Sequence, residues 1–323
     1  MTTLVIGAGL VGSQIARILA GEGETPVLMD SSAQPEALGE IVDLARVRLV
    51  AGDVLRPFAL TDAIREHKVT RIIHTAANPL LTMGAQKDPY AAIQLNIMGT
   101  VNVLEAARVM GLERVVVSSS NVLSHYLAGG EGKGDLAKEE ALPRPTTFYS
   151  VTKQTVENLG LNYARWCNVD FAAVRYGAVA GPWSGRGGGG PSNVFREAVV
   201  RALRGEEAVV PPGAMEWVYS KDAAMGTVQA LRVKDLKSRI FNVTMGRVTT
   251  PQELSAALKA VIPGAKTRIE QPAGTGPSLQ GNQHAGDLSL SREVLGYVPK
   301  FPDAEAAVRD MVEWYRANRR AGA

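Results

Sequence analysis

The chain alternates short apolar segments with longer segments in which apolar residues recur at helical spacing. Six short segments rich in Val and Ile predict strands, at residues 3–7, 26–30, 47–53, 71–77, 114–120 and 171–177. The longer segments predict helices, for example at residues 10–23, 91–111, 250–262 and 303–320. Strands that alternate with helices favour a parallel sheet covered on both faces. The pattern therefore predicts an α/β fold.

This regularity weakens after about Gly177. Residues 181–193 are rich in glycine and contain two prolines, so we expect no regular structure there and predict one long loop. A loop of this length is more often functional or mobile than idle.

Composition and charge exclude several classes of protein. The chain has 323 residues, of which 46% are hydrophobic, as in an ordinary globular protein of one large domain or two moderate ones. A net charge of +3 without a basic run gives no reason to propose a nucleic acid or membrane partner. The single Cys167 and four scattered histidines predict neither a disulfide nor a metal site. No apolar run approaches the roughly 20 residues of a membrane span, and the first residues read as a strand, so we expect a soluble, cytoplasmic protein.

A glycine pattern at the start of the chain predicts a dinucleotide site. Gly7, Gly9 and Gly12 form G-x-G-x-x-G between a predicted strand and a predicted helix, whose N-terminus can receive a pyrophosphate. Asp30 ends the second strand, where a carboxylate binds both adenosine ribose hydroxyls and repels the 2′-phosphate of NADP. The alternative is a strand–turn–helix that binds no nucleotide. Asp53 is a candidate for the adenine amino group, or else a turn aspartate.

The stretch "TTFYSVTKQTVE" places Tyr149 four residues before Lys153, on one face of a predicted helix. Taken alone, this spacing is explained most simply by a half-buried ring beside a solvated charge. The order of motifs along the chain changes that interpretation, because it resembles the extended short-chain dehydrogenase/reductase family, the NAD-dependent epimerase/dehydratase group. The resemblance covers nearly the whole chain and rests on residues 7–12, 30, 52–54, 72–77, 96–108, 115–120, 149–153, 175–182, 241–246, 287–301 and 312–316.

The resemblance implies a Rossmann-type doubly wound parallel sheet with a smaller C-terminal substrate-binding region. Residues 1–176 would bind NAD, residues 177–323 would mainly bind substrate, and residues 219–245 would return to the first unit. It also implies a homodimer that acts on a small molecule.

The catalytic residues implied by the resemblance are Tyr149, Lys153 and a serine. Tyr149 would remove or donate a hydroxyl proton, and Lys153 would hold the nicotinamide ribose and lower the pKa of the phenol. If the family pattern is aligned on the strand at residues 114–117, the serine that orients the substrate is Ser120. If it is aligned on residues 122–123, the serine is Ser119.

The remaining site residues are also implied by the resemblance. The cofactor set is Gly7, Gly9, Leu10, Val11, Gly12, Asp30, Asp53, Val54, Ala76, Ala77, Lys153 and Tyr176. The substrate set is Ser120, Asn121, Ala178, Arg186 and Met215. We interpret His74 and Asn96 as structural side chains.

The sequence departs from the family at several positions. The first glycine usually stands one residue earlier, at Ile6. Ala178 and Met215 replace an asparagine and an arginine that members acting on nucleotide sugars carry, and residues 274–286 lack a further arginine. A diphosphate ordinarily needs such donors. Arg186 either supplies one charge or is a solvated loop residue.

The sequence therefore predicts an NAD-dependent oxidoreductase that transfers a hydride at a secondary alcohol or carbonyl carbon. The substrate would be a small non-nucleotide compound, such as a sugar, a sugar acid or a hydroxylated organic molecule. The alternative is an epimerase or dehydratase that acts on a nucleotide sugar. A third alternative is a regulatory protein that senses NAD without catalysis.

Overall fold

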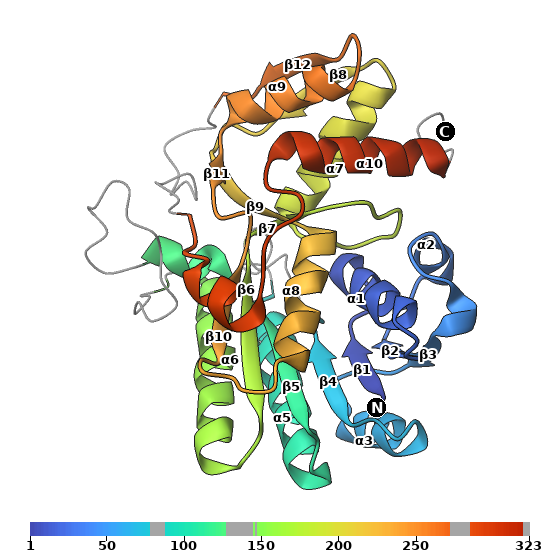
Figure 1. Ribbon diagram of the computed structural model, residues 1–323, viewed down its shortest axis with the longest axis vertical. Helices are drawn as coiled ribbons and strands as arrows, with labels where there is room; N and C mark the ends of the chain where they lie inside the picture. The colour runs from blue at the N-terminus through green and yellow to red at the C-terminus, as the bar shows by residue number, and fades with distance from the viewer. Residues whose placement is uncertain (78–87, 127–144, 146, 272–284, 319–323) are drawn as a thin grey trace.

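A seven-stranded parallel sheet forms the larger part of the structure, which is a computed structural model that describes residues 1–77, 88–126, 145, 147–271 and 285–318 (Figure 1). The strand order is β10-β6-β5-β4-β1-β2-β3. The strands are β1 (Thr3–Ile6), β2 (Val27–Asp30), β3 (Arg48–Ala51), β4 (Arg71–His74), β5 (Arg114–Ser120), β6 (Phe171–Tyr176) and β10 (Ile240–Val243). The chain order reverses between β1 and β4, which is the switch point of a doubly wound sheet. The predicted Rossmann-type fold is confirmed.

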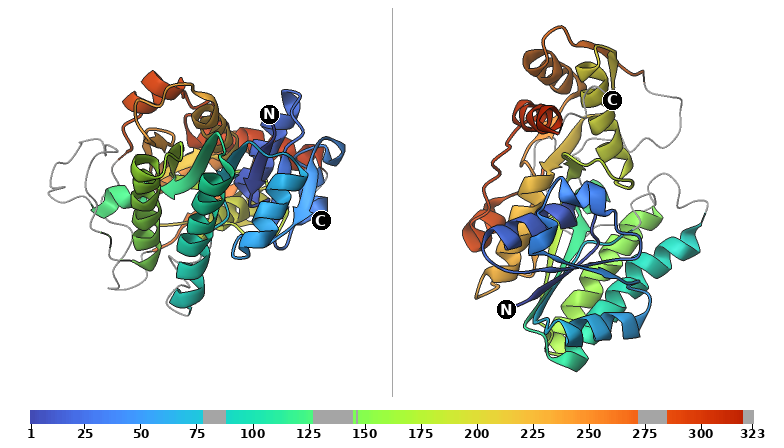
Figure 2. Two further views of the ribbon diagram at one scale, coloured as in Figure 1. Left: turned by 90° about the horizontal axis from the view of Figure 1, so that it is seen from below. Right: turned by 90° about the vertical axis from the view of Figure 1, so that its right-hand side faces the viewer.

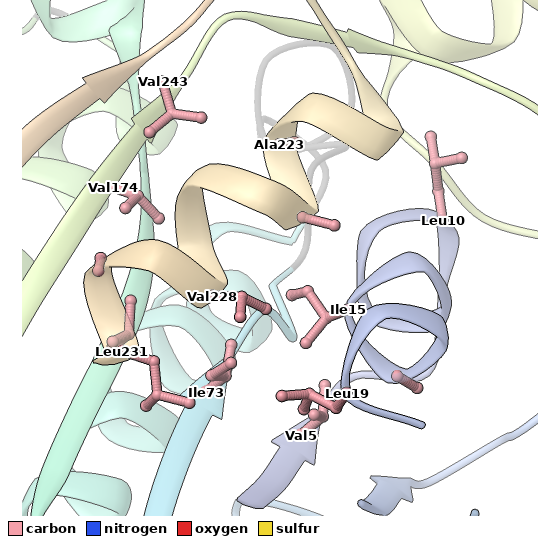
Figure 3. Close-up of a cluster of buried hydrophobic side chains, with 14 of the residues drawn as sticks. Val5, Leu10, Ile15, Leu19, Ile73, Val174, Ala223, Val228, Leu231 and Val243 are labelled. Carbon is pink, nitrogen blue, oxygen red and sulfur yellow. The ribbon is translucent and has the colours of Figure 1, made fainter. Parts of the chain in front are cut away.

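Helices cover both faces of this sheet because alternate strand residues are apolar on both sides. One face packs against α1 (Leu10–Gly21) and α8 (Ser220–Arg232), and the other against α3 (Pro57–Glu66), α5 (Gly99–Met110) and α6 (Phe148–Trp166). Val5 belongs to the first layer, whereas Leu4 and Ile6 belong to the second. Figure 3 shows Ile15 and Leu19 of α1 facing Val228 of α8 across this first layer.

A smaller unit stands above the carboxyl ends of the strands in Figure 1. Its core contains Phe195, Trp217, Leu258 and Met311. It is built from β7 (Ala178–Ala180), α7 (Gly190–Leu203), β8 (Glu207–Val210), β9 (Met215–Tyr219), β11 (Val248–Thr249), α9 (Pro251–Val261), β12 (Lys266–Ile269) and α10 (Ala304–Ala317). The strands pair as β11-β9-β7 and β12-β8.

The chain passes from the smaller unit back into the larger one. After β9, helix α8 packs beside α1, and β10 extends the large sheet next to β6. Helix α8 packs against the sheet layer, as the right-hand view of Figure 2 shows, and not among the helices of the smaller unit.

One expectation about the glycine-rich segment was wrong. Residues 190–193 are not loop, because α7 begins at Gly190 after an N-cap at Gly189. Pro191 in the first turn does not interrupt the helix, since the nitrogen of a first-turn residue has no helical partner to lose. The loop therefore ends at Gly189, the N-cap of α7.

Candidate active site

The turn between β1 and α1 brings two glycines into close backbone contact. Gly7 has a φ of +99°, and a Cβ added there would lie 2.7 Å from the backbone nitrogen of Ala76. A Cβ added at Gly12 would lie 1.8 Å from the carbonyl oxygen of Gly7. Only glycine fits at these positions, so α1 can begin directly against the turn.

Gly9 faces the other way, into open space. It is the N-cap of α1, and no atom of the described residues lies within 4 Å of a Cβ added there. The side chains of Leu10 and Val11 pack toward the core, so these residues offer only their backbone. The first turn of α1 therefore presents free N–H groups beside an open position, an arrangement that fits the pyrophosphate of NAD.

Asp30 ends β2 next to this turn. Its Oδ2 accepts a hydrogen bond from the backbone nitrogen of Ala8 at 2.8 Å, and its Oδ1 accepts one from Ser32 at 2.8 Å. These bonds hold the half-exposed carboxylate beside the glycine turn. Each oxygen has a second lone-pair direction that can accept from a ribose hydroxyl.

Asp53 and Val54 follow β3, farther along the same edge of the sheet. Asp53 Oδ1 accepts from the backbone nitrogen of Leu55 at 2.9 Å, which is the turn geometry named above as the alternative to adenine binding. Val54 is buried, and its carbonyl oxygen accepts from Asn102 at 2.9 Å. The structure thus fixes this turn without testing its predicted contact with adenine.

The segment after β4 completes the cofactor side. The backbone nitrogens of Thr75 and Ala76 both donate to the carbonyl of Ile6, at 2.8 and 2.9 Å, and Thr75 Oγ1 lies 3.1 Å from the carbonyl of Gly7. Ala77 follows directly. Thr75 braces the glycine turn, a role that sequence reasoning missed because the motif contains only glycines.

Helix α6 sets the positions of Tyr149 and Lys153. Thr147 and Ser150 form a reciprocal capping box that starts the helix just before the tyrosine. Lys153 lies one turn later and is buried, and its Nζ donates to the carbonyl of Ser118 at 2.8 Å. The same Nζ is 5.7 Å from the centroid of the Tyr149 ring.

Burial shifts the pKa values of both groups in opposite directions. It lowers the pKa of Lys153 to about 8, against a raising effect of Glu157. It also raises the pKa of Tyr149, against a lowering hydrogen bond with Ser120. We expected the ammonium to lower the pKa of the phenol, and in the protein alone that lowering does not prevail. Burial is the larger effect on the phenol, and the ammonium is engaged by the carbonyl of Ser118.

The structure separates the two candidate serines. Neighbouring residues on a strand point to opposite sides, and Ser119 Oγ donates to Glu157 at 2.5 Å. Glu157 also receives two hydrogen bonds from Arg175, both at 2.8 Å, in a buried ion pair. Ser120 instead forms the hydrogen bond with Tyr149. The geometry therefore joins Ser120, and not Ser119, to the tyrosine.

Two other residues near the cluster, Tyr176 and Asn96, are held by hydrogen bonds, and a third, His74, is buried and neutral. The hydroxyl of Tyr176 hydrogen-bonds to Thr227 of α8, so only its backbone, paired beside Ser120, faces the cofactor edge. Asn96 Nδ2 donates to Thr152 at 3.2 Å. His74 is buried, and burial followed by the charge of Lys153 lowers its pKa to about 3, so it is neutral.

The predicted substrate residues do not all gather in one place. Ala178 begins β7 and Met215 begins β9, and both pack against the core of the smaller unit. Asn121 follows Ser120, and its side-chain amide donates to Glu216. Glu216 escaped sequence reasoning, since an acidic residue within an apolar strand has no motif around it.

Arg186 lies on the nucleotide side of the structure. Its backbone nitrogen donates to Gln34 Oε1 at 2.6 Å, and its carbonyl accepts from Gln34 Nε2 at 3.1 Å. Gln34 is four residues after Asp30. The glycine-rich loop at Arg186 therefore lies near the end of β2 and not beside Ala178. The side chain of Arg186 is exposed. Of the stretch that lacks the further family arginine, residues 274–284 lie outside the described residues.

The described residues contain neither a metal-binding cluster nor a membrane-spanning helix. Among them, no group of three or more His, Cys, Asp or Glu side chains could hold a metal ion. Neither does any described helix have the length and apolar character that crossing a membrane requires.

Comparison with known proteins gives the same family that the motifs resemble. Residues 3–244 match the sequence model of the NAD dependent epimerase/dehydratase family. A UDP-glucose 4-epimerase of Mycolicibacterium smegmatis is 28% identical over 321 residues, which cover 98% of this chain and 99% of the relative.

Two solved structures have the same fold and different names. A Thermus thermophilus UDP-glucose 4-epimerase in complex with NAD is 27% identical, with a TM-score of 0.79 over 98% of this chain and 99% of that one. An L-threonine dehydrogenase from Phytophthora infestans is 26% identical, with a TM-score of 0.83 over 98% of this chain and 100% of that one. The family is thus NAD-dependent and includes both epimerases and dehydrogenases.

Proposed function

The chain belongs to the NAD dependent epimerase/dehydratase family, and from that premise we propose that it oxidises or reduces a small non-nucleotide substrate at a secondary alcohol or carbonyl carbon. The observation that carries this proposal is the cluster of Ser120, Tyr149 and Lys153. It combines a hydroxyl–phenol hydrogen bond with a buried ammonium one helical turn away.

In the proposed reaction, Tyr149 is the acid/base. NAD, when bound by the residues of the β1–α1 turn, would supply the acceptor for the hydride of the alcohol carbon. The Tyr149 oxygen takes the proton of the alcohol hydroxyl during oxidation and returns it during reduction. Because burial raises the pKa of Tyr149, the phenolate needs a nearby positive charge to form near neutral pH.

Ser120 and Lys153 support that proton transfer. Ser120 keeps its hydroxyl against the phenol and can hold the substrate oxygen at the same point. Lys153 is anchored to the carbonyl of Ser118 and has two further N–H donors for the nicotinamide ribose. A lysine pKa of about 8 leaves it mostly protonated at neutral pH.

The residues at two positions of the substrate region support the proposal of a non-nucleotide substrate. Ala178 and Met215 offer no charged or amide donor where members that bind nucleotide sugars carry them. A diphosphate without such donors loses charge-assisted hydrogen bonds. We therefore propose that UDP-sugars bind poorly and that compounds of the size of L-threonine are substrates.

A substrate panel tests this function. Purified protein with NAD should form NADH, followed at 340 nm, with at least one secondary alcohol among L-threonine, sugars, sugar acids and hydroxylated aromatics. NADP should support less turnover, because Asp30 repels its 2′-phosphate. Calorimetry with UDP in the presence of NAD should detect no micromolar binding.

The second candidate function is epimerisation of a nucleotide sugar, which the names of the relatives favour. In that case UDP-glucose would be converted while no NADH accumulates. NAD binding without turnover of any compound would instead favour a regulatory role.

The organisation of the chain is part of the proposal. We propose residues 1–176 and 219–245 as the NAD-binding unit and the rest of 177–323 as the substrate-binding region. We further propose that the protein works as a homodimer in the cytoplasm, without a nucleic acid partner.

A further inference from the structure

Glu216 is a buried carboxyl group that the proposed chemistry does not use. It lies in β9 with 2% of its surface exposed. Both of its oxygens accept a hydrogen bond from the backbone nitrogen of Gly286, at 3.0 and 2.9 Å. It also receives the side-chain amide of Asn121, the side chain of Thr244 and the backbone N–H of Gly246.

These donors come from separate parts of the chain that meet beside the reaction site. Asn121 directly follows Ser120 at the end of β5. Thr244 and Gly246 form the turn after β10, and Gly286 belongs to the segment that precedes α10. A carboxylate that is surrounded by donors can hold all three segments at once, which no neutral side chain of this size can do.

The contact with Asn121 bears directly on Ser120. Ser120 Oγ accepts from the backbone nitrogen of Val122 at 3.2 Å, so the serine belongs to the same short turn as Asn121. That turn is therefore fixed on one side by the strand and on the other by Glu216. A shift of the Asn121 side chain would move the hydroxyl that meets Tyr149.

We propose that Glu216 is a positioning residue: through Asn121 it orients Ser120 for proton transfer, and through Gly286 it fixes the chain segment that meets Glu216 from the other side. This inference rests on the proposed function, because it assigns Ser120 its catalytic contact. It adds a residue that acts on the reaction without touching substrate or cofactor.

The protonation state of Glu216 gives the proposal a signature. Burial raises the pKa of Glu216 to about 7, against the lowering effect of its hydrogen bonds. Tyr297 is a titratable neighbour, and burial raises its pKa so far that it stays neutral. The charged form, which accepts all of the donors, therefore prevails only above about pH 7, and turnover should rise with pH through that value.

The experiment compares Glu216→Gln with Asp222→Asn. Asp222 is a matched control, because it is also buried and also accepts two backbone N–H groups, from Lys300 and Phe301 at 3.0 and 2.9 Å, in bonds separate from those of Ser120 and Asn121. With the best secondary alcohol of the panel, Glu216→Gln should lower kcat by about 10- to 100-fold, the cost of a misplaced reacting group. The Kd for NAD should stay within about twofold, whereas Asp222→Asn should lose thermal stability but keep kcat.

A second readout needs no substrate. In ¹⁵N-labelled protein, the side-chain amide of Asn121 and the backbone amide of Gly286 should titrate together with a midpoint near pH 7. Both titrations should disappear in Glu216→Gln and persist in Asp222→Asn. Asn121→Ala should lower kcat similarly, and the double variant should be no worse than either single variant.

The outcomes separate this inference from the proposed function. If Tyr149→Phe is inactive while Glu216→Gln keeps normal kcat and its pH profile, the positioning role is wrong and the function stands. Equal losses of kcat in Glu216→Gln and Asp222→Asn would mean that the loss follows from lower stability, and would also overturn the positioning role. If Glu216→Gln does not fold, Asn121→Ala tests the proposal instead. In that variant the backbone amide of Gly286 must still titrate near pH 7 while kcat falls, and any other result contradicts the positioning role.

Discussion

The proposed chemistry depends on a single hydroxyl group, that of Tyr149. Its ring packs against Ala92, so Tyr149→Phe removes one oxygen and leaves the packing intact. We expect the Kd for NAD and the thermal stability to stay nearly unchanged, and kcat to fall by about 10²- to 10⁴-fold. Absorbance assays of NADH measure kcat, and calorimetry with NAD measures the Kd. Near-normal turnover would show that Tyr149 is not the acid/base and that the Tyr–Lys pair is only two neighbouring side chains on a helix.

Lys153→Ala provides the comparison for that variant. It should lose a similar share of turnover and also weaken NAD binding, because the ammonium is proposed to contact the nicotinamide ribose. The pH profile separates the two residues further. The rate of alcohol oxidation should rise as the phenol ionises, and this rise should be absent in Tyr149→Phe.

His74 predicts how the protein responds to acid. Its pKa of about 3 in the folded state lies below its ordinary value of 6.5, because burial and the charge of Lys153 disfavour the imidazolium. The unfolded chain therefore binds the extra proton first, and stability is lost as the pH falls from 6.5 toward 3. At pH 5 the loss amounts to about 2 kcal/mol. Urea titrations at several pH values should show this slope in the wild type and not in His74→Gln. An equal slope in both proteins would contradict it.

At the scale of the elements, the β1–α1 turn gives a matched pair of substitutions. Gly9→Ala places its Cβ in open space, so the protein should fold normally but lose NAD affinity, because a methyl group then occupies the approach of the pyrophosphate. Gly12→Ala places its Cβ 1.8 Å from the carbonyl of Gly7, so the turn itself must open and stability should fall. Thermal melts and calorimetry with NAD distinguish the two. Normal NAD binding by Gly9→Ala would place the pyrophosphate elsewhere.

The elements that the sequence predicted are those with strong local signals. Most predicted strands appear because their apolar residues are buried on both faces of a parallel sheet, whereas β3, at the edge of the sheet, is largely exposed. The start of α7 was missed, since Gly190 and Pro191 are poor helix residues in general and acceptable ones in a first turn. The predicted helix over residues 91–111 is interrupted by a π-helical turn at Gln94–Met98, which periodicity alone does not reveal.

Within the candidate site, motif residues were predictable and their partners were not. The choice between Ser119 and Ser120 needed the position of Glu157, which reaches Ser119 from α6. Likewise, Glu216 and Gly286 are 70 residues apart in sequence, and only the folded chain brings them together. Such contacts depend on long-range packing, for which a single sequence contains no local pattern.

At the scale of the whole molecule, two neighbouring helices carry exposed apolar side chains. Helices α5 and α6 lie side by side on the outer face of the sheet (Figure 1). The exposed large apolar residues on them are Val109, Phe148, Val151 and Trp166, and Trp166 is 73% exposed. A two-fold axis beside such a face would pair the same helices of two copies and bury these side chains. This face therefore supports the proposed homodimer.

A charge introduced into that face, at Trp166, the last residue of α6, tests the assembly. Trp166→Arg should convert the dimer into a monomer, because two copies of the cation would face one another across the two-fold axis without partners. Val298→Arg is the control, since Val298 is apolar and 61% exposed but lies in the segment before α10, away from α5 and α6. Light scattering coupled to size-exclusion chromatography should give twice the chain mass for the wild type and the control, and one chain mass for Trp166→Arg. A wild type that runs as a monomer, or a Trp166→Arg variant that stays dimeric, would show that this face is not the interface.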